Sequence, residues 1–366
     1  MSNSRVVERF INYVKTSSES GHEREFCLLI AAELERLGFT VDRDECGDKI
    51  DSDGFNVHAF LKGSSDAEPL MFCCHLDTVS PGVGISPIIT DGYIHTDGTT
   101  VLGGDDKAGI AAVLEGVERL VERDALGRSV EVLFTLREET GLQGSGAADY
   151  SLVKSNQAIV FDCGGPIGTV ITRSPEMINF EVTVLGKAAH AAYPQGSIHA
   201  LKAAALAVAN INVGLVDDIS EVNVGNFLAP GKTNIVCPKA TFGVEVRSYD
   251  RAHAEELYQN ILAAVNDACA RFGASCEISK PRITCGVNIA PDSALLKAVE
   301  AALAKKGHTM LPESTFGGCD ASNLSAHGIA ALNVSCGMDR VHSTEERIAV
   351  ADLEATADFV ESILAK

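Results

Sequence analysis

Three short apolar segments in the first half of the chain each run into histidine or acidic residues. The segments are residues 70–74, 130–136 and 158–161, and the polar residues that follow them are His75, Asp77, Glu138, Glu139 and Asp162. Continuous apolar runs of this length are typical of strands buried on both faces of a parallel sheet. Ligands of such sheets bind at the carboxyl ends of the strands. The pattern therefore predicts that these polar side chains gather at one edge of one sheet.

Helical segments alternate with these strands. Residues 22–37 form an amphipathic pattern that ends at Gly38, and apolar residues recur at helical spacing between residues 110 and 121. Alternating strands and helices are typical of α/β domains. We therefore expect an α/β domain with a mixed, mostly parallel sheet and helices on both faces.

The rhythm of the sequence changes near Arg173. The elements expected after it are a strand at 177–185, a helix at 197–212, strands at 220–227 and 234–247, a helix at 251–272 and a strand at 274–279. This βαββαβ order is that of a ferredoxin-like unit. A helix at 293–305, a strand at 330–334 and a last helix to residue 366 then restore the first pattern. We therefore expect residues 174–283 to form a smaller domain inserted into a larger one made of residues 1–173 and 284–366.

The charge balance excludes several classes of partner. The chain of 366 residues has 30 Lys and Arg against 50 Asp and Glu, a formal net charge of −20. Proteins that coat nucleic acid or anionic membranes need clustered cations, so neither partner is expected. No apolar stretch approaches the roughly 18 residues of a membrane helix, and no signal peptide is visible. The 11 cysteines are scattered and include no Cys-x-x-Cys pair, which favours a cytoplasmic protein.

More residues of the same kind lie farther along the chain. Asp105 and Asp106 follow two glycines at a helix start, and His342 follows the strand at 330–334 after a glycine loop. Each residue alone has an ordinary explanation, because acids suit helix starts and the turns after strands are solvated. If all these residues lie at one sheet edge, the ordinary explanations would have to apply to each of them by coincidence. Imidazoles and carboxylates without a thiolate suit Zn²⁺, Mn²⁺ or Co²⁺.

The set also offers the parts of a hydrolytic two-metal site. One carboxylate that bridges two ions lets them share and acidify a water molecule. Asp77 is close enough to His75 in sequence to hold the far nitrogen of its ring. Of the neighbours Glu138 and Glu139, one can bind metal while the other acts as general base and acid. A Gly-x-x-x-x-Gly-Lys-Ser/Thr loop, a Gly-x-Ser-x-Gly elbow and a His-Glu-x-x-His motif are all absent from the sequence.

The motifs at these positions resemble those of a known family. In chain order they are His75-Leu-Asp77-Thr-Val, Gly103-Gly-Asp-Asp-Lys-Ala-Gly109, Glu138-Glu139-Thr-Gly, Asp162 and His342. They resemble the motif set of the dinuclear zinc exopeptidase family that contains peptidase T, carboxypeptidase G and succinyl-diaminopimelate desuccinylase. The likeness covers nearly the whole chain and is greatest to the peptidase T-like (tripeptide aminopeptidase) branch.

The resemblance implies a role for each residue of the predicted site. The metal ligands implied are Asp105 as a bridge between two divalent ions, His75 and Asp162 on one ion, and Glu139 and His342 on the other. Glu138 would be the general acid and base, and Asp77 the partner of His75. The bond between Asp105 and Asp106 would be the cis peptide typical of the family. The ions implied are Zn²⁺, with Co²⁺ or Mn²⁺ as alternatives.

The inserted domain contains further residues that resemble family positions. His190, in Gly186-Lys-Ala-Ala-His190, resembles the histidine that reaches a neighbouring active site across a homodimer to stabilise the oxyanion. Asn234 and Arg247, near the two ends of one expected strand, resemble the pair that holds a substrate carboxylate or carbonyl. The alternatives are a surface position for His190 and an ordinary ion pair for Arg247. The loop that ends in Asp320 resembles the loop near the substrate, although Asp320 also suits a helix cap.

These features together predict a metal-dependent exopeptidase that cleaves the N-terminal bond of small peptides. The inserted domain would act as a lid over the peptide and as the dimer contact. A second interpretation keeps the chemistry but makes the substrate an N-acyl amino acid. A third is a catalytically silent metal- or peptide-binding protein. Glu138 opposes the third interpretation, because a binding protein needs no base beside its ligands.

Overall fold

The computed structural model describes residues 4–366 and divides into two compact units. The described chain up to Arg173 and Val287–Lys366 form the first unit, and Ser174–Gly286 form the second. The second junction falls at Gly286, whereas the sequence places it at residue 283. The reason is β14 (Arg282–Thr284), which pairs with β9 (Glu176–Leu185) and so belongs to the sheet of the inserted unit.

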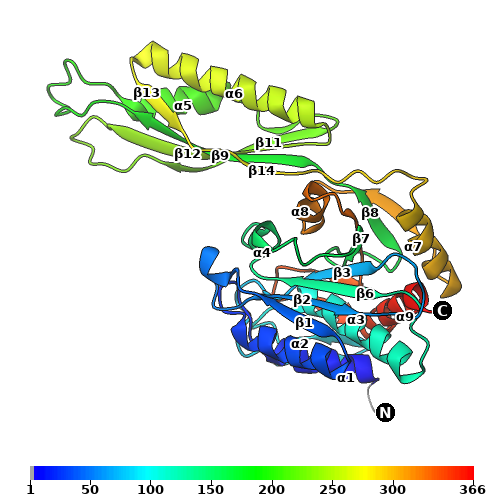
Figure 1. Ribbon diagram of the computed structural model, residues 1–366. Coiled ribbons are helices and arrows are strands. Elements are labelled where there is room, and N and C mark those ends of the chain that lie inside the picture. Colours follow the sequence, from blue (N-terminus) through cyan, green and yellow to red (C-terminus); the bar gives the residue numbers. More distant parts are fainter. Residues whose placement is uncertain (1–3) are drawn as a thin grey trace. The chain divides into compact units, whose positions relative to one another are not determined.

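One mixed sheet forms the frame of the first unit (Figure 1). Its strands, in spatial order, are β1 (Thr40–Asp44), β2 (Asn56–Leu61), β6 (Val130–Thr135), β3 (Leu70–His75), β7 (Gln157–Val160), β16 (Ala330–Val334), β8 (Thr169–Arg173) and β15 (Leu311–Ser314). β3 pairs in parallel with β6 and β7, β16 with β7, and β15 with β8. The pairs β1–β2, β2–β6 and β16–β8 are antiparallel. The expected mixed, mostly parallel sheet is confirmed.

Strand β3 shows how this sheet is covered on both faces. All its residues are buried, and successive side chains of a strand point to opposite faces. Phe72 and Cys74 belong to one apolar core, and Met71 and Cys73 belong to another. Helices of the first core are α1 (Arg5–Lys15), α2 (Arg24–Arg36), α3 (Gly104–Glu122), α7 (Ala294–Lys305) and α9 (Val350–Leu364), and the second core contains α8 (Ala321–Ala326). The first unit also has α4 (Gln143–Ala147) and a short 3-10 helix (Gly47–Lys49).

A small second sheet in the first unit has no counterpart in the sequence-based expectations. It joins β4 (Ile88–Thr90) and β5 (Tyr93–His95), which precede α3, to β17 (Met338–Asp339) and β18 (Arg347–Ala349), which follow β16. β18 pairs with β5 in antiparallel register. This pairing brings the segment before α3 beside the turn between β17 and β18, which contains His342.

The inserted unit is an antiparallel sheet that shares one apolar core with two helices. Its strand order is β10 (Gly214–Asp217), β11 (Ser220–Leu228), β12 (Lys239–Ser248), β9 and β13 (Ser275–Ile278), with β14 beside β9. The helices are α5 (Ala200–Asn210) and α6 (Arg251–Phe272). The expected βαββαβ order is present, and β10 adds an edge strand. Within residues 4–366, no helix has the length and hydropathy needed to cross a membrane.

Strand β12 is shorter than the sequence predicts. The expected strand covers residues 234–247, but β12 begins at Lys239, directly after Pro238, whose nitrogen cannot donate a ladder hydrogen bond. The residues before the proline pair elsewhere, since the N–H of Ala191 donates to the carbonyl of Asn234 at 2.9 Å. The expectation that Asn234 lies at the end of this strand is therefore wrong, and Asn234 lies in the preceding loop.

Candidate metal centre

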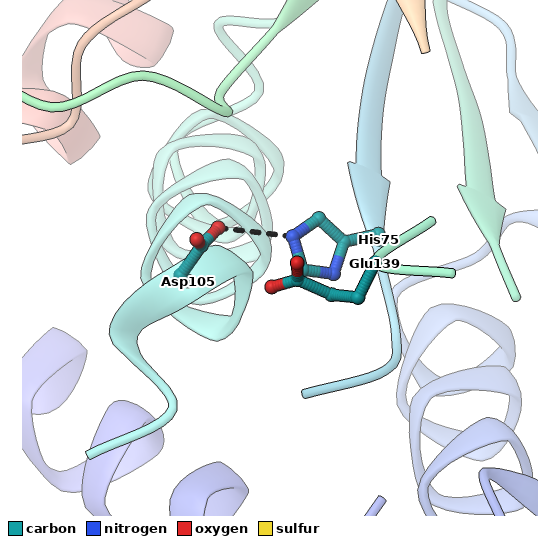
Figure 2. A group of neighbouring side chains, drawn as sticks. All are labelled: His75, Asp105 and Glu139. Atoms are coloured by element: carbon teal, nitrogen blue, oxygen red, sulfur yellow. Dashed lines mark hydrogen bonds and ion pairs between the residues drawn. The ribbon is translucent and has the colours of Figure 1, made fainter. Parts of the chain in front are cut away.

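Asp105 lies between two histidines from distant parts of the chain. Its Oδ1 is 2.9 Å from Nε2 of His75, and its Oδ2 is 3.2 Å from Nε2 of His342. Figure 2 shows His75 and Asp105 turned toward each other, with Glu139 beside them. One oxygen of this carboxylate thus lies beside each of two imidazole rings that could bind metal.

Local backbone structure brings these side chains together. His75 is the last residue of β3 and lies opposite Thr135, the last residue of β6. Asp105 follows Gly103, whose φ of 73° is in the left-handed region that favours glycine. The peptide bond between Asp105 and Asp106 is cis, as the resemblance implies. Sheet ends and one helix start thus converge, as expected for an open α/β sheet.

Further acidic residues complete the cluster. Oε1 of Glu139 is 2.9 Å from Nε2 of His342. Two sets of three residues each offer ligand atoms that lie within 4.8 Å of one another, namely His75, Asp105 and Glu139, and His75, Glu138 and Asp162. The structure thus brings together the residues expected to bind metal. The second set also includes Glu138, to which the resemblance gives the role of acid and base.

Asp77 contacts both His75 and the pair Glu138 and Glu139. Nδ1 of His75 is 2.8 Å from the carbonyl oxygen of Asp77 and 3.4 Å from its carboxylate Oδ1. The backbone N–H groups of Glu138 and Glu139 donate to the Asp77 carboxylate at 2.9 and 3.3 Å, and the hydroxyl of Ser20 donates to it at 2.6 Å. Because Nδ1 faces Asp77, Nε2 is the nitrogen of His75 that remains to bind a metal.

Both histidines have raised pKa values in the metal-free protein. Burial opposes the charge of His75, but hydrogen bonds to Asp105 and Asp77 raise its pKa well above the usual value. Hydrogen bonds to Asp105 and Glu139 raise the pKa of His342 to about 10. The surrounding carboxylates therefore favour the cationic form of both rings, which partly neutralises their charge.

The pKa values of the carboxylates shift in different directions. Burial opposes the charge of Asp105, yet hydrogen bonds from His342 and His75 hold its pKa below the usual range. Burial raises the pKa of Asp162 well above its usual value, and the charge of Asp105 adds to the effect. Burial and the charge of Asp162 raise the pKa of Glu138 in the same way. The site therefore combines a bridge candidate whose ionised form is favoured with acids whose ionised form burial disfavours.

The surroundings of the Asp162 carboxylate indicate whether this cluster fits a metal ion. Its Oδ2 is buried and has no hydrogen-bond partner among the described residues, and such unpaired buried atoms are uncommon in folded proteins. Its backbone is fixed by Asn333, which accepts from the Asp162 N–H at 2.8 Å and donates to its carbonyl at 2.5 Å. A buried carboxylate oxygen without a donor, next to imidazoles, suits a divalent cation. The donor set fits the group that the resemblance implies.

Sequence reasoning gave no role to several residues that support the cluster. Asn333 is a polar residue within an otherwise apolar strand, and this pattern could have marked it. Glu346, whose carboxylate binds the backbone around Asp105, is one of two adjacent acids in a polar loop, so no pattern marks it. Asp320 does not cap α8 with its side chain. Its carboxylate instead accepts hydrogen bonds from Thr135 and Ser145, at the two ends of the segment that contains Glu138.

The candidate residues of the inserted unit fall into two places. His190 forms a bridge pair with Ile235, the neighbour of Asn234, and its Nδ1 accepts from the N–H of Ala192 at 3.1 Å. Arg247 lies near the end of β12, where its guanidinium is 2.7 Å from Glu245. His190 and Asn234 are thus close to each other, whereas Arg247 makes the ordinary ion pair that was its alternative interpretation.

The fold and the site together define a class of protein, a mixed α/β protein with an inserted antiparallel unit and a candidate two-metal site. A family model described as peptidase family M20/M25/M40 matches residues 71–366. The chain belongs to this family and is a hydrolase that acts on peptide bonds, as the resemblance implies.

Individual relatives agree with this assignment. The protein YqjE of Bacillus subtilis (strain 168), described as uncharacterized, is 32% identical over 361 residues, which cover 98% of this chain and 97% of the relative. The crystal structure of aminopeptidase PepT from Bacillus cereus ATCC 10987 is 31% identical with a TM-score of 0.90, over 98% of this chain and 97% of that chain. A tripeptidase from Staphylococcus aureus subsp. aureus Mu50 is 28% identical with a TM-score of 0.93 over the same shares.

Proposed function

We propose that the protein is a dinuclear metal-dependent aminopeptidase of the peptidase T type, which hydrolyses the N-terminal peptide bond of small peptides. The observation that supports this most directly is the position of Asp105, with one carboxylate oxygen toward each of two histidines. In the proposal Asp105 would bridge the ions, which would be Zn²⁺ or, alternatively, Co²⁺ or Mn²⁺. His75 and Asp162 would hold one ion, and Glu139 and His342 would hold the other.

The chain supplies the proton transfers of this reaction. Two bound divalent ions would polarise the scissile carbonyl and lower the pKa of a shared water. Glu138 takes a proton from the water and returns it to the leaving amine. Its burial supports this role, because a carboxylate with a raised pKa is a stronger base towards the water and keeps the proton at neutral pH until the amine takes it. Asp77 fixes the backbone of Glu138 and the ring of His75.

The inserted unit supplies the remaining roles in the proposal. His190 stabilises the oxyanion in the active site of a second subunit across a homodimer, and Asn234 and Arg247 hold a carboxylate or carbonyl of the peptide. The similarity to an aminopeptidase and a tripeptidase supports a short, unblocked peptide as substrate. A cytoplasmic location is part of the proposal and agrees with a chain of 11 cysteines and no Cys-x-x-Cys pair.

A peptide panel tests the proposal. Metal-loaded protein is incubated with dipeptides and tripeptides, each with a free and with an N-acetylated terminus, and the released amino acids are identified. The proposal expects cleavage of the free peptides at their first bond. Cleavage of only the acetylated set would show an N-acyl-amino-acid deacylase, and bound metal without cleavage of any peptide would show a binding protein.

A further inference from the structure

Glu346 is a buried carboxylate that the proposed chemistry does not use. It lies in the same turn as His342, and only 2% of its surface is exposed. Its Oε2 accepts hydrogen bonds from the backbone N–H groups of Leu102 at 2.7 Å and Gly103 at 2.8 Å. Its Oε1 accepts one from the N–H of Asp105 at 3.1 Å. One side chain from the turn that contains His342 therefore binds the backbone that contains Asp105.

These contacts hold the segment that leads into the regular part of α3. Asp105 and Asp106 lie within the bounds of α3 but have non-helical backbone angles, and Gly103 before them has no side chain that could bind their backbone. A carboxylate suits this position because its two oxygens can accept several hydrogen bonds from backbone N–H groups. The fit is close, since a Cβ on Gly104 would lie 3.0 Å from Oε1 of Glu346. Glu346 therefore fixes the start of α3 relative to the turn between β17 and β18.

The contact matters for the metal centre because each of its two segments contains a candidate ligand. Oδ2 of Asp105 and Nε2 of His342 lie 3.2 Å apart. The backbone N–H bound by Glu346 belongs to Asp105 itself, so a shift of this contact moves the carboxylate that faces both histidines. Functional metal ligands must be held to within about 0.5 Å of their productive positions.

We propose that Glu346 is a positioning residue of the metal centre, which sets Asp105 relative to His342 and thereby the affinity for the bridged ions. The inference rests on the proposed function, since it gives Asp105 the role of bridge. Glu346 acts through the backbone of Asp105 and contacts neither the ions nor the peptide.

The substitution Glu346→Gln tests this role with little change in shape. The amide oxygen of glutamine still accepts hydrogen bonds, but its nitrogen only donates. Either the N–H of Asp105 or those of Leu102 and Gly103 therefore lose their acceptor. The matched control is Glu345→Gln, which removes the same charge from the neighbouring residue. The side chain of Glu345 is 73% exposed and pairs with Arg340.

Two measurements report on the centre without peptide hydrolysis. The first is the affinity of the metal-free protein for Zn²⁺, measured by competition with a chelator, and the second is the visible spectrum of the Co²⁺-loaded protein. Glu346→Gln is expected to weaken Zn²⁺ binding about 10- to 100-fold and to change the Co²⁺ spectrum. Glu345→Gln is expected to match the wild type in both.

The outcomes separate a positioning role from a structural one. If Glu346 only stabilises the segment that leads into α3, Glu346→Gln will lower the melting temperature of the metal-free protein but leave Zn²⁺ affinity and the Co²⁺ spectrum unchanged, and the inference is overturned. If Glu346→Gln does not fold, Glu346→Asp keeps the charge on a shorter side chain and is expected to weaken Zn²⁺ binding. Wild-type affinity in Glu346→Asp would also overturn the inference.

The same measurements distinguish this inference from the proposed function. A wild-type protein that binds Zn²⁺ but hydrolyses no peptide contradicts the proposed function and leaves the positioning role to be decided by the variants. A wild-type protein that binds no divalent ion contradicts both.

Discussion

Oδ1 of Asp77 accepts a hydrogen bond from the backbone N–H of Glu138 at 2.9 Å and lies 3.4 Å from Nδ1 of His75. The same carboxylate therefore orients a candidate metal ligand and fixes the backbone of the candidate acid and base. Hydrogen bonds and the charge of His75 keep the pKa of Asp77 below its usual value in spite of burial. Asp77 is thus ionised at neutral pH and can interact with both the Glu138 N–H and the His75 ring.

Replacing Asp77 should impair both metal binding and turnover. Asp77→Asn removes the charge that stabilises the His75 ring, so we expect a loss of about 10- to 100-fold in Zn²⁺ affinity and in kcat/KM. Ser20→Ala removes only the hydroxyl that donates to Oδ2 of Asp77 and should have a smaller effect in the same direction. Chelator competition and steady-state kinetics measure both quantities. Wild-type affinity in Asp77→Asn would show that this carboxylate does not support the metal centre.

Replacing Glu138 should separate metal binding from catalysis. Glu138→Gln keeps the shape of the side chain but cannot take up a proton, so kcat should fall by a factor of about 100 to 10,000. The metal content, measured on the same sample, should stay near that of the wild type. Lost metal would instead make Glu138 a ligand, as its place beside His75 and Asp162 allows. Retained turnover would refute its role as acid and base.

Metal uptake should release protons. In the metal-free protein the pKa of His342 is raised to about 10 by its bonds to Asp105 and Glu139, and that of His75 is raised as well. Metal ligands are neutral imidazoles, so at pH 7 His342 must lose a proton when an ion binds, and the raised pKa of His75 acts in the same direction. Affinity should therefore rise as the pH increases towards 10, because fewer protons are displaced.

Calorimetry in buffers with different ionisation enthalpies measures this release. At pH 7 the apparent enthalpy of Zn²⁺ binding should change with the buffer, by an amount that corresponds to about one proton per chain or more. His342→Asn should reduce this number. An apparent enthalpy that is the same in all buffers would mean that the histidines are already neutral.

The proposed role of His190 can be tested by mixing inactive subunits. If His190 acts across a homodimer, a dimer of one Glu138→Gln and one His190→Ala subunit contains one intact site. Random exchange of equal amounts would then restore up to about one quarter of wild-type activity. Size measurements must show that dimers form and exchange. Mixed dimers without any recovered activity would assign His190 to its own subunit or to no catalytic role.

Local sequence patterns were enough to predict the edge of the sheet where the cluster lies. His75 and Asp162 follow continuous apolar runs. Such runs are typical of parallel strands that are buried on both faces. The helix after Asp105 was visible from its apolar spacing. These positions depend on short-range signals, which a sequence shows directly.

Contacts between distant segments were not visible in the same way. The sheet that pairs β18 with β5 depends on strands of three residues each, which are too short to show a periodic pattern. Glu346 looks like an ordinary surface acid until the fold buries it against backbone N–H groups. The sequence offers a substrate loop or a helix cap for Asp320, but not its bonds to the hydroxyls of Thr135 and Ser145. The start of β12 is different, because Pro238 marks it in the sequence itself, whereas only the fold shows that Asn234 pairs with Ala191.

The central claim is that two divalent ions, bridged by Asp105, are required for peptide hydrolysis. Its most direct test is a titration of chelator-treated protein with Zn²⁺ while the hydrolysis of an unblocked tripeptide is followed. We expect no activity without metal and a maximum at two equivalents of Zn²⁺ per chain. Full activity in the metal-free protein, or a maximum at one equivalent, would contradict the claim.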